Sequence, residues 1–479
     1  MLLNVLLINS SFGQLKIPPF FGDNMILQQN EENYIWGWTE KITDVNIHTS
    51  WNSKSIVTKS DKNGYWKIAF NVPKADLKEH TIKISSNKSS IILNDIMFGE
   101  IWVCSGQSNM EMTLKGNFNE PVTGSNKAIA ESSNKFIRQF RLDYNFAKTP
   151  IKDCKGNWQK ANPNTTPDFS AIGYFFANQI YKGINVPVGI INTTWGGTAI
   201  ESWMDKGLLT NNFRYVNLNE LETQNVNFKS PTVLYNAMIN PLVGLKIKGF
   251  LWYQGESNVS NYPKNYVDHF PAMIKKWRKL WNQGDFPFYY VQICPFNYSK
   301  KDALPIIEAQ LKTMELVLNT GMVTTGDIGE QWNIHPKSKK EVGQRLAYWA
   351  LNKQYNFTKI QYGGPYFKNL KIEENKAIIE FQNAPNGLTP ANTPLNEFWI
   401  AGADKIFYRA NAKVKIQWEL PHHLRIPLVE VSHEKVPKPV AIRYGWTNYF
   451  EASLFDTGGN PASPFRTDNW NSFIKADNN

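Results

Sequence analysis

A serine that directly follows an apolar, strand-like run is the first group in this chain placed to do chemistry. In the segment CSGQSNM, which ends at Met110, Gly106 permits a sharp turn and Ser108 would open the next helix. At a helix start, the serine backbone N–H and the helix dipole both face a developing oxyanion. The position therefore predicts that Ser108 attacks a carbonyl carbon, with a simple helix N-cap as the structural alternative.

A histidine at a second strand end could serve as the base for that serine. Between residues 97 and 353 the chain has two histidines, and His269 lies within an amphipathic helical pattern. His335 instead closes a polar segment that follows the strand ending at Asp327. Because the site of an open parallel sheet lies at the carboxyl ends of its strands, His335 is the predicted base by elimination. It would take the serine proton and return it to a leaving alcohol, unless it only caps the following helix.

Two further strand ends carry groups that could stabilise an oxyanion. The pair Gly196-Gly197 lets backbone amides approach a substrate oxygen closely. The side-chain amide of Gln254 or Asn258 could donate a hydrogen bond without carrying charge. Glu256 lies between these two residues, and a buried unpaired carboxylate is costly, so we expect it to pair with another group of the site. A purely structural ion pair is the alternative for Glu256.

The elements that must position these residues alternate apolar runs with helical periodicity between residues 97 and 353. This alternation is typical of a parallel sheet covered by helices, so we predict a doubly wound α/β domain. The expected strands are Glu100–Cys104, Val186–Asn192, Gly249–Tyr253, Phe288–Ile293 and Met322–Asp327. The expected helices are Ser170–Gly183, Tyr262–Trp281, Ile306–Leu318 and Pro336–Asn352.

All-β patterns flank this domain on both sides. Short alternating segments with turn residues predict an N-terminal β module at 15–96 and a C-terminal β region at 354–479. The expected C-terminal strands are Lys376–Phe381, Glu397–Ile400, Lys413–Glu419 and Ala441–Tyr444. Residues 1–14 resemble a signal peptide, which predicts export to the periplasm or the cell exterior. No other stretch reaches the ~20 apolar residues of a membrane span.

Composition narrows the classes of partner and cofactor. The formal net charge is +11, but Lys and Arg are scattered among Asp and Glu, so we do not expect a nucleic-acid partner. Cys104, Cys154 and Cys294 show no CxxC spacing, which indicates neither a disulfide framework nor a zinc site. Cys104 and Cys294 lie in apolar runs and are expected to be buried thiols. We expect no metal and no cofactor, and the sequence predicts no oligomeric state.

Four blocks in this order resemble the signature of a known family. They are GQSNM around Ser108, GGTAIESW from Gly196, WYQGESN from Trp252 and DIGEQWNIHPKSKKEVGQRLA from Asp327. The chain is similar to the sialate O-acetylesterase-like SGNH hydrolases, relatives of acetylxylan esterases. The closing segments FWIAGADKIFYRA, VAIRYGWTNY and PASPFRTDNW extend this resemblance to nearly the whole chain.

The resemblance implies an SGNH-hydrolase-like fold and a serine esterase that releases acetate from an O-acetylated carbohydrate. It implies Ser108 as nucleophile and His335 as its partner. It also implies an oxyanion hole made by the Ser108 amide, an amide of Gly196 or Gly197, and the Gln254 side chain. A sialate O-acetylesterase is the first expectation. The alternatives are an esterase acting on acetylxylan or another hemicellulose, and a glycan-binding protein without catalysis.

The residue that orients the histidine is the point where the chain departs from the family pattern. Relatives commonly carry Asp two residues before the histidine, whereas Asn333 stands here. The orienting group fixes the tautomer and stabilises the imidazolium, so another carboxylate or a backbone carbonyl could act. The candidates are Asp327, Glu330 and Glu256. We favour Asp327 because it ends a predicted strand.

Overall fold

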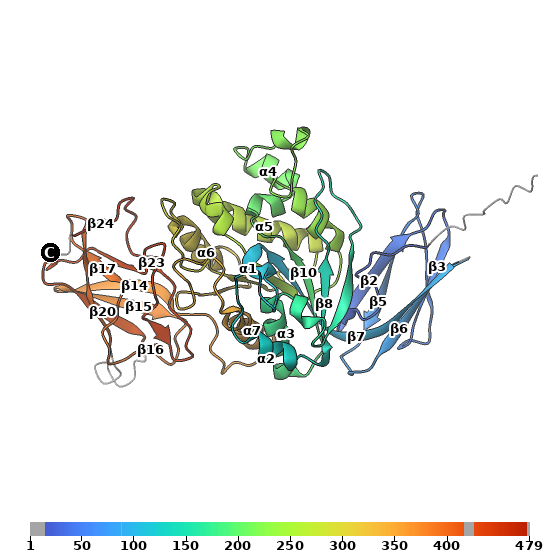
Figure 1. Cartoon of the computed structure of the whole chain (residues 1–479), viewed down its shortest axis with the longest axis horizontal. Helices are drawn as coiled ribbons and strands as arrows, with labels where there is room; N and C mark the ends of the chain where they lie inside the picture. Colours follow the sequence, from blue (N-terminus) through green and yellow to red (C-terminus); the bar gives the residue numbers. More distant parts are fainter. Residues whose placement is uncertain (1–14, 88, 416–425, 477–479) are drawn as a thin grey trace, which may run out of the picture.

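A mostly parallel sheet runs through the middle of the molecule (Figure 1). The structure is a computed structural model and describes residues 15–87, 89–415 and 426–476. The strands lie in the order β13-β12-β11-β7-β10-β8-β9, and only the β8–β9 pair is antiparallel. They are β7 (Ser89–Gly106), β8 (Asn134–Leu142), β9 (Gly156–Ala161), β10 (Val188–Thr194), β11 (Gly249–Tyr253), β12 (Phe288–Val291) and β13 (Thr320–Val323).

Helices cover both faces of this sheet because its central strands are apolar on both sides. In β11, Phe250 and Trp252 pack against Trp277 of α5, whereas Leu251 and Tyr253 belong to the buried cluster that contains the apolar residues of α3 and α7. A strand buried on both faces reads as a continuous apolar run, which is how it was predicted. The helices of the two layers are α3 (Ala171–Ile184), α5 (Tyr266–Trp281), α6 (Leu304–Leu316) and α7 (Lys339–Gln354).

The expected elements of the α/β region each overlap an observed one. The prediction of a central parallel sheet with flanking β regions is confirmed. It omitted β8 and the antiparallel edge strand β9, and it began the last helix at Pro336, whereas α7 begins at Lys339. His335 is therefore on a loop rather than at a helix start. Short helices complete the region, namely α1 (Ser108–Glu111), α2 (Ser125–Ala130) and α4 (Lys206–Asn212).

Strand β7 joins the N-terminal β module to the central sheet. Its first half pairs antiparallel with β6, its middle pairs with β1, and its second half pairs with β10 and β11. The boundary predicted between residues 96 and 97 thus falls inside one continuous strand. The other strands of the module, at one end of the molecule in Figure 1, are β1 (Ile26–Gln28), β2 (Glu31–Trp38), β3 (Asp44–Thr49), β4 (Ile56–Lys59), β5 (Tyr65–Val72) and β6 (His80–Ser86).

The C-terminal β region lies at the opposite end of the molecule (Figure 1) and has a buried core of its own. Its strands are β14 (Tyr366–Glu373), β15 (Lys376–Gln382), β16 (Leu388–Thr389), β17 (Phe398–Ala401), β18 (Ile406–Arg409), β19 (Asn411–Val414), β20 (Leu428–Ser432), β21 (Ala441–Tyr444), β22 (Phe455–Asp456), β23 (Phe465–Arg466) and β24 (Ile474–Lys475). The expected strand Lys413–Glu419 begins within β19, and its residues from 416 onward lie outside the described part. Arg466 joins this region to α6 through an ion pair with Glu308 at 2.8 Å.

Cysteine burial and the length of the helices bear on two of the expectations drawn from the sequence. Cys104 and Cys294 are buried, as expected, and burial raises the pKa of Cys294 to about 11. Among residues 15–87, 89–415 and 426–476, no helix has the length and apolar content needed to cross a bilayer. The signal-like segment 1–14 lies outside the described residues.

Candidate active site

Ser108 follows a sharp turn at Gly106, and the neighbouring strand β11 leaves room only for glycine at that position. Strand β7 ends at Gly106 with φ +128°, and a Cβ at this position would lie 2.2 Å from the carbonyl oxygen of Tyr253 on β11. The amide of Gln107 donates to the same carbonyl oxygen at 2.9 Å. Ser108 then opens α1, where its own N–H is not used by the helix hydrogen bonds. The predicted serine therefore lies at the carboxyl edge of the sheet with a free-standing amide.

His335 faces this serine from the loop between β13 and α7. Its Nε2 lies 2.8 Å from Ser108 Oγ. The backbone of His335 is held by Asn333, whose Oδ1 accepts from the His335 amide at 3.0 Å and whose Nδ2 donates to the His335 carbonyl at 3.0 Å. The structure therefore brings the two residues expected to act as nucleophile and base into hydrogen-bond contact.

The other nitrogen of the imidazole contacts Glu120, which the sequence reasoning did not consider. His335 Nδ1 lies 2.5 Å from Glu120 Oε1, and the two side chains are only 20% and 27% exposed. Partial burial by itself would raise the pKa of Glu120, but hydrogen bonds from His335 and Asn117 outweigh it and lower that pKa. The carboxylate is therefore held in its charged form beside the ring.

Asp327 does not contact the imidazole, which corrects the expectation that it orients His335. Its carboxylate forms a two-pronged ion pair with Arg345 of α7, at 2.8 and 2.6 Å. Such a pair occupies both carboxylate oxygens in a fixed geometry. Glu330, another candidate, accepts from the backbone amide of Lys337 at 3.0 Å. Both carboxylates belong to the framework of the loop rather than to the base.

Glu256, the third candidate, lies in a buried cluster behind the nucleophile. Asn109 Nδ2 donates to Glu256 Oε1 at 2.5 Å, and Asn109 Oδ1 accepts from Lys339 Nζ at 2.5 Å. Burial raises the pKa of Glu256 despite the hydrogen bond from Asn109, and burial lowers the pKa of Lys339 to about 8. Glu256 therefore pairs, as expected, with another polar group of the region, and that group is the buried side chain of Asn109.

Gln254 and Asn258 are parts of a buried framework, which corrects their expected role as oxyanion donors. Gln254 Nε2 donates to the Thr198 carbonyl at 3.2 Å and to Asn258 Oδ1 at 2.7 Å, and its Oε1 accepts from Tyr266 at 3.0 Å. An amide group has two donor hydrogens, and both are used here. Asn258 Nδ2 donates to both oxygens of Glu201, at 3.0 and 3.1 Å. Neither amide faces solvent, because both side chains are fully buried.

The glycine pair lies on the other flank of the serine. A Cβ on Gly196 would lie 3.2 Å from Ser108 Cβ, so the two residues are in direct contact. The Gly196 amide donates to the Glu111 carboxylate, whose other oxygen accepts from the Tyr144 hydroxyl. Gly197 has φ +71° and is exposed to solvent. A substrate oxyanion that used the Gly196 amide would therefore have to replace Glu111 there.

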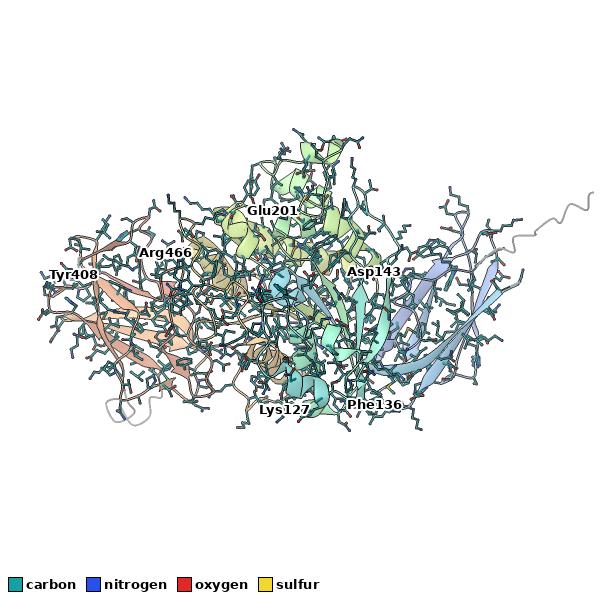
Figure 2. All side chains as sticks on the ribbon, in the orientation of Figure 1. Lys127, Phe136, Asp143, Glu201, Tyr408 and Arg466 are labelled. Carbon is teal, nitrogen blue, oxygen red and sulfur yellow. The ribbon has the colours of Figure 1, made fainter. Side chains whose placement is uncertain are left out.

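A second histidine–carboxylate pair lies deeper in the same region. His269 Nδ1 contacts Glu201 Oε1 at 2.8 Å, with side chains 0% and 5% exposed. The other ring nitrogen of His269 contacts the Tyr215 hydroxyl at 2.8 Å. Figure 2 labels Glu201 beside α5, the helix that carries His269. His269, which was not predicted to be the base because it lies within a helix, is therefore also paired with a carboxylate.

Aromatic side chains lie on the segments that carry Gly196, Glu120 and His335. Trp195, which precedes the glycine pair, stacks on Phe228 at 4.7 Å between ring centroids, and Tyr144 lies against it at 4.6 Å. Phe118 and Trp332 belong to the loops that carry Glu120 and His335, and they are 91% and 77% exposed. Phe118 and Trp332 therefore expose large apolar faces on the loops that carry Glu120 and His335.

A family model described as carbohydrate esterase, sialic acid-specific acetylesterase matches residues 98–352, more than half of the chain. The chain belongs to this family. The sialate O-acetylesterases of Pongo abelii and Homo sapiens are each 30% identical to it over 317 residues. That alignment covers 60% of this chain and 59% of theirs, so the chain spans less than two thirds of these relatives.

A solved structure resembles this member of the acetylesterase family over a greater length. The crystal structure of a carbohydrate acetylesterase from Xanthomonas citri is 31% identical, with a TM-score of 0.85. The similarity covers 95% of this chain and 100% of that one, so it includes both flanking β regions.

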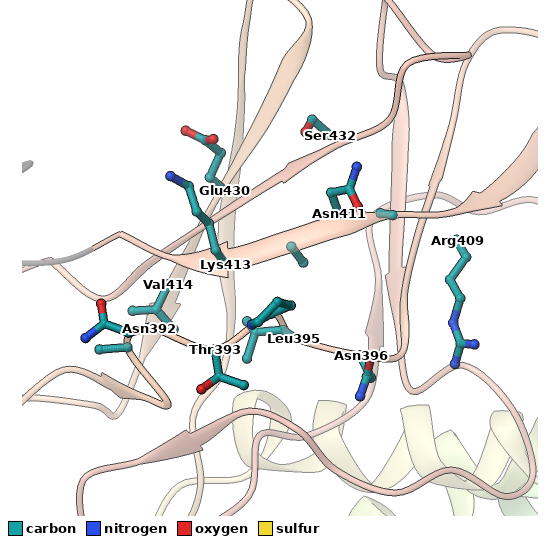
Figure 3. A pocket seen from close by; sticks show the side chains of 14 residues that line it. Asn392, Thr393, Leu395, Asn396, Arg409, Asn411, Lys413, Val414, Glu430 and Ser432 are labelled. Carbon is teal, nitrogen blue, oxygen red and sulfur yellow. The ribbon is translucent and has the colours of Figure 1, made fainter.

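Outside the Ser108 region, this member of the acetylesterase family has a further cavity and, among its described residues, no metal-binding cluster. Among the described residues, no group of three or more His, Cys, Asp or Glu side chains has the arrangement of a metal site. A cavity of about 690 Å³ lies in the C-terminal β region and is lined by residues of β18, β19 and β20 and by the segment 391–396 (Figure 3). None of the predicted site residues lines it.

Proposed function

We propose that the protein is a carbohydrate O-acetylesterase of the SGNH-hydrolase type that removes acetyl groups from O-acetylated sialic acids. The observation that carries this proposal is the 2.8 Å contact between His335 Nε2 and Ser108 Oγ at the carboxyl edge of the parallel sheet. A hydroxyl at a helix start, bonded to a histidine, is the arrangement that acyl transfer to serine requires. Family membership supports acetyl esters of carbohydrates as the substrates.

The reaction would proceed in two steps. Ser108 Oγ attacks the acetyl carbonyl carbon while its proton passes to His335 Nε2, and the bond to the sugar oxygen breaks as that oxygen takes the proton. Water then attacks the acetyl-serine and gives a proton to the same nitrogen. Acetic acid leaves and ionises to acetate by releasing its proton to solvent, and Ser108 Oγ takes back the proton held on His335 Nε2. No cofactor takes part in either step.

The oxyanion of the tetrahedral intermediate would be held by backbone amides. The Ser108 amide is free of helix hydrogen bonds because Ser108 is the first residue of α1. Gly196 contacts Ser108, and its amide would become available once Glu111 is displaced. Gly197 adds a second amide on the same turn. Once Glu111 has left the Gly196 amide, these backbone donors are held by a strand end and a glycine turn and need not move as the negative charge develops.

A second candidate exists for the sugar that carries the acetyl group. The mammalian relatives are sialate O-acetylesterases, whereas the relative that resembles the whole chain is named only as a carbohydrate acetylesterase. An acetylated hemicellulose such as acetylxylan is therefore the second candidate substrate. The predicted division into a module at 15–96, an esterase domain at 97–353 and a β region at 354–479, and export directed by residues 1–14, belong to the same proposal.

The test is acetate release by the purified protein. O-acetylated sialic acid, acetylated xylo-oligosaccharide and an aryl acetate would be compared with wild type and with Ser108→Ala. We expect the substitution to lower kcat by on the order of 10⁴ or more on every substrate that wild type cleaves. Ser257→Ala, a serine of the neighbouring segment outside the Ser108–His335 pair, is the matched control and should keep wild-type turnover.

Each outcome of this comparison has a distinct meaning. A wild type that prefers the sialic acid supports the sialate assignment, and one that prefers the xylo-oligosaccharide replaces it with the hemicellulose assignment. Cleavage of the aryl acetate alone would support the serine esterase mechanism and would rule out both proposed carbohydrate substrates. A wild type that binds glycans but releases no acetate would make the protein a carbohydrate-binding member of the family.

A further inference from the structure

A carboxylate 215 residues before His335 in the sequence faces the side of its ring that points away from the serine. Glu120 Oε1 lies 2.5 Å from Nδ1, while Nε2 lies 2.8 Å from Ser108 Oγ. With both nitrogens engaged, Nδ1–H donates to the carboxylate and Nε2 accepts from the serine hydroxyl. This is the tautomer that a general base needs, and it is fixed by the bond on the far nitrogen.

The loop that carries Glu120 holds the carboxylate in place independently of the histidine. Asn117 and Glu120 exchange backbone hydrogen bonds of 2.9 and 3.1 Å, and Asn117 Nδ2 donates to Glu120 Oε2 at 3.0 Å. Gly116 has φ +83°, and a Cβ there would lie 2.5 Å from the Glu120 carbonyl oxygen, so this turn requires glycine. Beyond the turn, the Thr123 amide donates to the Lys337 carbonyl at 3.0 Å. The loop is thereby tied to the segment that carries the base.

Asn333, two residues before His335, holds the backbone of the histidine rather than its ring. The side chain of Asn333 bonds to both the amide and the carbonyl of His335. An amide can accept one of these bonds and donate the other, whereas a carboxylate can only accept. Asn333 therefore fixes the histidine backbone, and the ring is left for a carboxylate from another loop.

We infer that Glu120 is the positioning residue of the proposed catalytic histidine, His335. Its carboxylate fixes the tautomer and orientation of His335 and stabilises the imidazolium that forms when Ser108 gives up its proton. Nδ1 keeps its own proton throughout, and only the serine proton moves, to Nε2 and then to the leaving oxygen. The inference rests on the proposed esterase function.

The first test substitutes Glu120→Gln and measures kcat and KM on an aryl acetate. Removing the charge and offering an amide to Nδ1 should lower kcat by about 10³–10⁴, because the ring is then free to adopt the wrong tautomer. KM and the melting temperature should stay close to wild type. Asp327→Asn is the matched control, since this carboxylate pairs with Arg345 and should be dispensable for turnover.

The second test is chemical rescue, which a merely structural role would not show. Glu120→Ala leaves a gap that opens to solvent, because the side chain is 27% exposed. Sodium formate should raise kcat of this variant in a saturable way, whereas sodium chloride at equal ionic strength should not. Turnover of Glu120→Gln at the wild-type rate would overturn the inference. So would a loss that formate does not relieve and that comes with a lowered melting temperature. A wild type without esterase activity would instead refute the proposed function, so the two failures are distinguishable.

Discussion

Among the described residues, the central α/β region holds two histidine–carboxylate pairs, and their difference shows what distinguishes the proposed catalytic pair from a structural one. Glu120–His335 and Glu201–His269 have similar contact distances, 2.5 and 2.8 Å. The first is partly exposed, and its free ring nitrogen meets a serine hydroxyl at a strand end. The second is buried, and its free nitrogen meets the hydroxyl of Tyr215. The pair alone therefore does not define a site, because the third partner and access from solvent decide its use.

The largest expected effect is the difference in kcat between the variants His335→Ala and His269→Ala. His335→Ala should lower kcat on an aryl acetate by on the order of 10⁴–10⁶, since it removes the base. His269→Ala should keep turnover to within about tenfold but lower the melting temperature, because it leaves a buried carboxylate unpaired. Parallel kinetics and thermal melts would check both. Equal losses of kcat in the two variants would contradict the distinction.

The next effect concerns stability in the buried pair. Glu201 accepts hydrogen bonds from His269 and from Asn258, so Glu201→Gln should lower the free energy of unfolding by about 3 kcal/mol. Tyr215→Phe is the milder companion, because it removes one hydroxyl from the half-exposed end of the network and should cost about 1 kcal/mol. Urea denaturation would measure both. A wild-type midpoint for Glu201→Gln would show that the network contributes little to stability.

The smallest expected effect is a pH dependence of stability that comes from the Glu120–His335 pair. The pKa of Glu120 in the folded protein lies below its ordinary value of 4.5. Between these two values the unfolded chain binds more protons, so the stabilisation is complete above about 4.5 and is lost as the pH falls through the folded pKa. The melting temperature of wild type should therefore exceed that of Glu120→Gln by only a small margin at neutral pH, because the pair is partly exposed, and this margin should narrow in acid. Thermal melts from neutral pH into acid would check this, and a gap that widened in acid would contradict it.

The nucleophile and the base were predictable because their signals are local. Ser108 follows an apolar run that had to be a buried strand, and a glycine two residues earlier marks the turn. His335 follows another such strand. In a parallel sheet, all strand ends of this kind come to one edge, so two local patterns were enough to predict a meeting of residues far apart in the sequence.

The same reasoning failed for the groups whose partners are set by packing. Gln254 and Asn258 also follow a strand, but their amides turn inward to Thr198 and Glu201. Polarity at a strand end is compatible with a substrate contact and with a buried network alike. Only the directions of the side chains distinguish the two.

The sequence by itself therefore determined the layers of the fold and the meeting of Ser108 with His335, because burial periodicity and strand polarity are properties of short segments. The tertiary structure decided which carboxylate faces the imidazole. Glu120 lies in a polar loop with no apolar period, and its place depends on a glycine turn and on the Thr123–Lys337 hydrogen bond between two loops. Asp327 follows a strand and was therefore the stronger candidate from the sequence, but its carboxylate pairs with Arg345 of α7 instead of with the imidazole. A contact between loops depends on how the whole domain closes, and no short segment encodes that.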